Sequence, residues 1–73
     1  MVVRLIALAD GKRMVMATLS LVDGEVQMQG KVPPHIERLL ADLRKSAKSP
    51  KNFLRSLPGS ISGTYLRAEL SES

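Results

Sequence analysis

The side chains that most often carry out chemistry in proteins are scarce in this sequence. His35 is the only histidine, and the 73 residues contain no cysteine. A histidine is the usual general base near neutral pH, and cysteine supplies the thiolates of many nucleophiles and metal sites. His35 follows two prolines at the start of an expected helix, where a lone histidine is typical of an ordinary first-turn residue. The sequence therefore predicts no catalytic, metal or cofactor site, and a protein that is not an enzyme.

Basic residues form the most biased feature of the sequence. The formal net charge is +4, and the segment 44–67 contains no acidic residue. Such a run is expected of a surface that contacts nucleic-acid phosphates, although the solvated face of a helix has a similar composition. The predicted contact residues are Arg44, Lys45, Lys48, Lys51 and Arg55, and all but Lys45 would share one stripe if two successive helices ran nearly collinear.

Two Asp-Gly pairs divide the first thirty residues into three runs with the composition of strands. Asp-Gly between apolar runs is typical of a two-residue type I′ hairpin turn, because both central positions of that turn need a positive φ. The predicted strands cover residues 2–9, 13–22 and 25–29, which form a β-meander within residues 1–30. The third run alternates apolar and polar residues, which indicates a strand at the edge of the sheet.

Apolar residues recur at helical spacing after the meander. Proline near the start of this segment suits a first helical turn, and the Ser49-Pro50 pair predicts the start of a second helix. We expect the helical segment to cover residues 33–57, to end before Pro58-Gly59, and to be followed by a last strand at 64–70. The apolar stripe of the first helix consists of Ile36, Leu39, Leu40, Leu43 and Ala47.

The resulting order β-β-β-α-α-β predicts an α+β fold in which residues 1–73 form a single small domain. We expect a four-stranded, mostly antiparallel sheet with two helices packed on one face. The first run is apolar on both of its faces, so the last strand is expected beside it. A chain of this size builds one modest core, and such domains are often helped by oligomerisation when they lack disulfides and metals.

The outer sheet face, opposite the helices, is the predicted interaction surface. An exposed apolar patch on a small domain often marks a partner surface, and methionine adapts to irregular contacts. The alternative is that a helix or tail covers the patch. The residues predicted to form this interface are Ile6, Leu8, Met14, Met16 and Tyr65.

Two hypotheses about function follow from these surfaces. The first is a non-enzymatic interaction module that self-associates, most simply as a homodimer, through the outer sheet face or through a free strand edge. The alternative is a basic accessory protein that contacts nucleic-acid phosphates through residues 44–55 without sequence specificity. Enzymatic activity ranks third.

The N-terminal apolar run is interrupted by Arg4 and ends at Asp10, which makes it too short for a secretory signal. No run approaches the ~20 apolar residues of a membrane span. Together with the absence of cysteine, these features predict a soluble, cytoplasmic protein with no membrane span.

Overall fold

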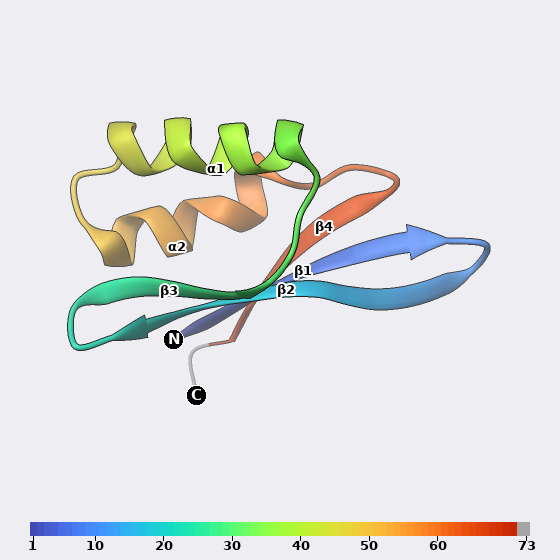
Figure 1. The fold of residues 1–73 in the computed structure, drawn as a ribbon, viewed down its shortest axis with the longest axis horizontal. Helices are drawn as coiled ribbons and strands as arrows, with labels where there is room; N and C mark the ends of the chain where they lie inside the picture. Colours follow the sequence, from blue (N-terminus) through green and yellow to red (C-terminus); the bar gives the residue numbers. More distant parts are fainter. Residues whose placement is uncertain (72–73) are drawn as a thin grey trace.

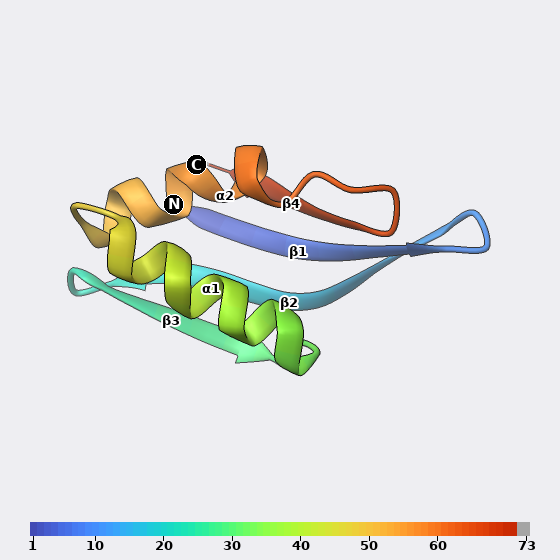
Figure 2. The same ribbon diagram turned by 90° about the horizontal axis from the view of Figure 1, so that it is seen from above.

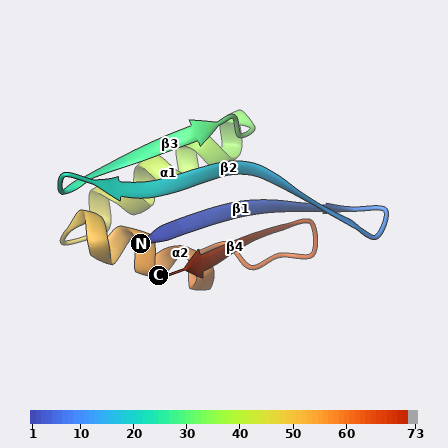
Figure 3. The same cartoon turned by 90° about the horizontal axis from the view of Figure 1, so that it is seen from below.

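The computed structural model describes residues 1–71, which form a four-stranded sheet covered on one face by two helices (Figure 1). The strand order is β3-β2-β1-β4, and all neighbouring strands are antiparallel (Figure 3). This arrangement confirms the predicted α+β class, the order of elements, the edge position of the third strand and the pairing of the last strand with the first. The elements are β1 (Val2–Ala9), β2 (Lys12–Val22), β3 (Glu25–Gly30), α1 (Pro34–Ser46), α2 (Pro50–Ser60) and β4 (Leu66–Ser71).

Both Asp-Gly pairs form the predicted hairpin turns. The φ angles are 53° at Asp10 and 72° at Gly11, and 52° at Asp23 and 80° at Gly24. Positive φ at both central residues is the signature of the type I′ turn, whose twist matches that of the flanking strands. These turns set the register of β1 with β2 and of β2 with β3.

The hydrophobic core lies between α2 and the middle of the sheet. Ser49 caps α2 by accepting a hydrogen bond from the Asn52 N–H over 3.1 Å, and Pro50 occupies the first helical turn. The helix packs against β4, β2 and β1 (Figure 2). The buried residues of this core are Val3, Leu5, Ala17, Leu19, Leu40, Phe53, Leu54, Leu57, Ile61 and Ala68.

The predicted end of α2 at Leu57 is wrong, because the helix continues through Pro58 to Ser60. Pro58 lies in the last turn of α2 and removes one helical hydrogen bond, because it has no N–H to donate to the Leu54 carbonyl. The Ile61 N–H then donates to the Leu57 carbonyl over 2.8 Å, and the Ile61 side chain is only 5% exposed. Burial of Ile61 in the core therefore outweighs the local preference of Pro58-Gly59 to stop the helix.

An irregularity in β2 changes which of its residues face the helices. Leu5 pairs with Ala17, but Ile6 pairs with Val15, so Met16 is an extra residue that forms a β-bulge. Strict alternation back from Ala17 would put Val15 on the helix side of the sheet, but the bulge shifts the preceding side chains to the opposite face, so Val15 lies on the outer face.

Gly30 ends β3 directly opposite this bulge. Its φ is +103°, and a Cβ at this position would lie 2.4 Å from the Met16 carbonyl oxygen. Only glycine fits such a close approach of two backbones without a shift of one of them.

We expect Gly30→Ala to lower the free energy of unfolding by at least about 2 kcal/mol, because it combines a positive φ with a backbone clash. Gly59→Ala is the matched control, since Gly59 lies in α2 with nothing within 4 Å of its virtual Cβ. The control should be neutral or up to about 1 kcal/mol more stable. Urea unfolding followed by circular dichroism measures both, and equal effects would contradict this role of Gly30.

Candidate interaction surfaces

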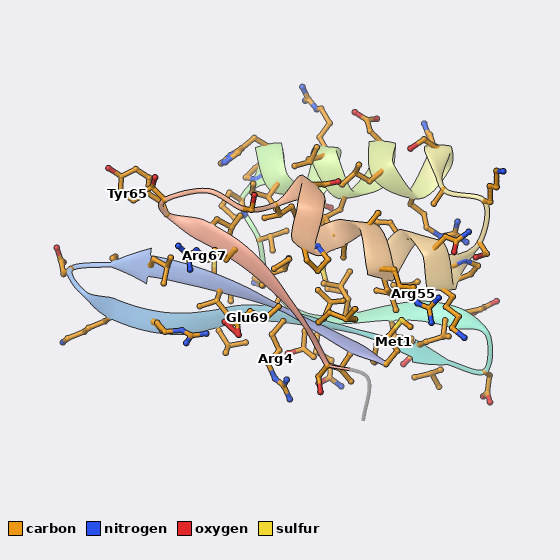
Figure 4. The ribbon with its side chains drawn as sticks, turned by 180° about the vertical axis from the view of Figure 1, so that it is seen from behind. Met1, Arg4, Arg55, Tyr65, Arg67 and Glu69 are labelled. Carbon is orange, nitrogen blue, oxygen red and sulfur yellow. The ribbon has the colours of Figure 1, made fainter. Side chains whose placement is uncertain are left out.

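The outer sheet face is polar over most of its area. Cross-strand pairing places Gln29, Thr18, Arg4 and Glu69 in one row across the four strands. Ser20 and Gln27 pair in the adjacent row. Arg4 points away from the helices (Figure 4), and Arg67, two residues before Glu69 on β4, shares the same face. Its exposed apolar residues, Val15 and Val22, are seven residues apart on β2, so most of this face has the composition of a solvated surface.

One apolar residue of the outer face is buried beneath an ion pair. Arg13 on β2 binds Glu69 on β4, which is the one ion pair within residues 1–71. Arg13 lies opposite Leu8 and Glu69 lies opposite Arg4, so a line between them crosses β1 at Ile6. Ile6 is only 4% exposed, although it lies outside the core cluster. The ion pair spans β1 over Ile6, and the aliphatic stems of its two side chains contribute to this burial.

The residues of the predicted outer-face interface do not form one surface. Leu8 and Tyr65 are neighbours, since the Leu8 N–H donates to the Tyr65 carbonyl over 2.8 Å. Met14 pairs with Ala7, which places it on the helix side of the sheet, and it is 68% exposed because the β1–β2 hairpin projects beyond the helices (Figure 1). Met16 is the half-buried bulge residue, and Ile6 is buried.

The predicted basic stripe requires collinear helices, but the chain reverses between α1 and α2. The two helices lie side by side and run in opposite directions (Figures 1 and 2). Arg44, Lys45, Lys48 and Lys51 consequently gather around the reversal, and all four are exposed. Arg55 lies one turn further along α2, where it lines a hollow with Met1, Leu21 and Lys51 (Figure 4).

A groove of about 410 Å³ lies between α1 and the free edge of β3. Its apolar residues include Met28 and Leu40, and charged side chains lie at its borders. Met28 is 43% exposed. The lining residues are Leu19, Glu25, Val26, Met28, Glu37, Leu40, Ala41, Arg44 and Phe53.

The groove exists because the two helices cover the sheet unequally. α2 packs directly on β4, β2 and β1. Within the described residues, α1 packs mainly against α2 rather than against the strands. Leu40 is the one buried residue of α1, and Leu39 of the same apolar stripe is 36% exposed. The sequence predicts β3 as an edge strand but not this groove, because the periodicity of α1 does not specify how deeply the helix packs.

Comparison of the chain with family models, curated proteins and solved structures finds no match. Within residues 1–71, no three His, Cys, Asp or Glu side chains group as potential metal ligands. No helix in this described part is both long and apolar enough to cross a membrane. The surfaces described above are therefore the available basis for a functional proposal.

The Arg13–Glu69 pair should contribute little to stability, because the two side chains are 61% and 49% exposed. We expect a double-mutant cycle of Arg13→Ala and Glu69→Ala to give a coupling of about 0.2–1 kcal/mol that falls as salt is added. Chemical unfolding of the four proteins measures it. A salt-independent coupling above about 2 kcal/mol would contradict this assignment as an exposed pair.

Proposed function

We propose that this chain is a small non-enzymatic interaction module that self-associates through the β3 edge and the groove between β3 and α1. The observation that carries the proposal is the combination of an unpaired strand edge with exposed apolar side chains beside it, Met28 among them. This location replaces the outer sheet face of the sequence-based hypothesis, because that face is polar and Ile6 is buried there.

The β3 backbone supports strand addition at this edge. Val22 and Glu25 flank the two-residue turn and form a main-chain hydrogen-bonded pair. Hydrogen bonds to β2 then recur at every second residue of β3, starting at Glu25. The N–H and C=O groups of Val26 and Met28 therefore point away from β2, toward the open edge. An unpaired edge of this type binds a further strand through main-chain hydrogen bonds, and neighbouring side-chain contacts give the binding its specificity.

The mass of the protein in solution tests this proposal. We expect size exclusion with light scattering at high micromolar concentration to give twice the chain mass of 8.0 kDa. Met28→Glu should shift the protein to monomer, because the carboxylate would be desolvated against apolar groove residues. Circular dichroism should show an unchanged fold, since Met28 is partly exposed.

Met14→Glu is the matched control, because Met14 is also exposed but lies on the projecting hairpin. It should leave the dimer intact. A strict monomer for the unmodified protein would contradict self-association. A dimer that is lost with Met14→Glu or Leu8→Glu but retained with Met28→Glu would place the interface away from β3.

A second function, phosphate contact with nucleic acid, is supported by the gathering of basic residues around the α1–α2 reversal. Arg44, Lys45, Lys48 and Lys51 are exposed there, and no carboxylate pairs with them within the described residues. A cluster of this kind binds the phosphate backbone without reading sequence. Arg55 completes the set predicted from the sequence.

Under this second proposal, the unmodified protein binds duplex or single-stranded nucleic acid at ~50 mM salt, with an affinity that falls steeply as salt rises. Lys48→Glu with Lys51→Glu should reduce the affinity at least about tenfold and lower the salt slope. Fluorescence anisotropy of a labelled oligonucleotide measures both. Lys12→Glu with Lys31→Glu is the control, since these lysines lie away from the reversal. Undetectable binding at this low salt would exclude the function.

A further inference from the structure

We infer that the partner of the β3 edge is the same edge of a second copy, in a closed two-fold dimer centred on Gln27. This inference rests on the self-association proposed above. It adds the orientation of the two chains, the strand register and the contacts between the two α1 helices. Two independent features of the described residues point to it: the order of side chains along β3 and the order of charges along α1.

Antiparallel pairing of β3 with its copy around Gln27 is self-complementary. Val26 then lies opposite Met28 of the second copy, and Glu25 lies opposite Gln29 of the second copy. The pairing joins Val26 and Met28 through the backbone groups that point toward the open edge. Beyond the strand ends, Asp23 lies opposite Lys31 of the second copy, so opposite charges meet and no like charges are opposed.

The exposed edge of α1 has the same two-fold complementarity. Glu37, Ala41 and Arg44 line the groove, and their spacing of four and three residues places them on one stripe of the helix. Figure 2 shows that α1 lies above the β2–β3 side of the sheet and runs in the direction opposite to β3. A two-fold axis beside β3 therefore brings Glu37 opposite Arg44 of the second copy, with the small Ala41 residues near the axis.

The geometry of α1 and β3 places both sets of contacts on one axis. Glu37 lines the groove and also an adjoining hollow with Met28 and Gly30, whereas Arg44 lines the groove with Glu25. The midpoint of Glu37 and Arg44 therefore lies near Gln27. Paired strands are about 4.8 Å apart and packed helix axes about 8–10 Å apart, so two α1 helices come into contact when each axis is set back by about 2 Å from its own β3 toward α2.

The alternative contact, β3 with the β4 edge of another copy, would build an open filament rather than a closed dimer. The β4 edge is unlike the β3 edge, because the segment before β4 already pairs with part of it: the Ala68 N–H donates to the Ile61 carbonyl, and Ser62 forms a β-bridge with Arg67. The grooves and hollows that border β3 lie under α1 and beside Gly30. Two like edges with open grooves therefore match each other better than one open and one covered edge.

Charge reversal at the helix pair tests the inference. Glu37→Arg alone and Arg44→Glu alone each place like charges at positions 37 and 44 of the two copies, twice in each dimer. Each variant should therefore raise the dissociation constant of the dimer at least about tenfold. An equimolar mixture of the two variants should bring the dissociation constant back to within about threefold of that of the unmodified protein, because every pair in the mixed dimer is again opposite in sign. Sedimentation equilibrium at low salt measures all three.

Asp42→Arg and Lys45→Glu provide the matched control, because they change the net charge equally on α1 but do not line the groove. Neither should weaken the dimer at low salt by more than about threefold. If the unmodified protein is dimeric but mixing the Glu37 and Arg44 variants gives no recovery, this two-fold geometry is wrong while self-association stands. If the unmodified protein is monomeric, the proposed function fails first.

Single cysteines test the strand register, since the natural chain has none. Gln27 pairs with its own copy at a position without main-chain hydrogen bonds, where Cα atoms are about 4.5 Å apart and a disulfide can form. We expect Gln27→Cys to give a cross-linked dimer under mild oxidation. Gln29→Cys, on the same exposed strand, should stay uncross-linked at the same concentration. The reverse result would overturn the register centred on Gln27.

Discussion

The packing of α2 on the centre of the sheet is the interaction on which the rest of the structure depends. Leu54 and Leu57 of α2 and Val3 and Leu5 of β1 are completely removed from solvent. Such packing supplies most of the stabilisation available to a chain of this size, since burial of apolar area is the main favourable term in folding. α2 packs against the centre of the sheet, and α1 packs beside it, mainly against α2.

This unequal division of the sheet makes its two edges different. β4 lies under α2, whereas β3 borders a groove beneath a helix that buries only Leu40. A free edge beside exposed apolar side chains is an aggregation hazard unless the protein uses or protects it. The self-complementary order of Glu37, Ala41 and Arg44 offers a way to close this edge with a second copy, and a closed dimer leaves no further β3 edge for uncontrolled pairing.

Local sequence signals predict much of the fold. Both type I′ turns, the N-cap Ser49, the strand composition and the helical period of α1 depend on interactions within a few residues. The position of β4 beside β1 also follows, because β1 is apolar on both faces. The features that these local signals do not predict depend on how the chain packs in three dimensions. Ile61 continues α2 past Pro58, and the backbone of Gly30 approaches the bulge at Met16.

The sequence by itself therefore determines the class of the fold, its order of elements, and the lack of thiol chemistry in a chain without cysteine. Only the tertiary structure decides which surfaces those elements present. The bulge at Met16 moves Val15 to the outer face, an ion pair covers Ile6, and the reversal between the helices gathers basic residues that would otherwise form a stripe. The physical reason is that a register shift of one residue exchanges the faces of a strand, and the depth at which a helix packs depends on the whole core rather than on its own periodicity.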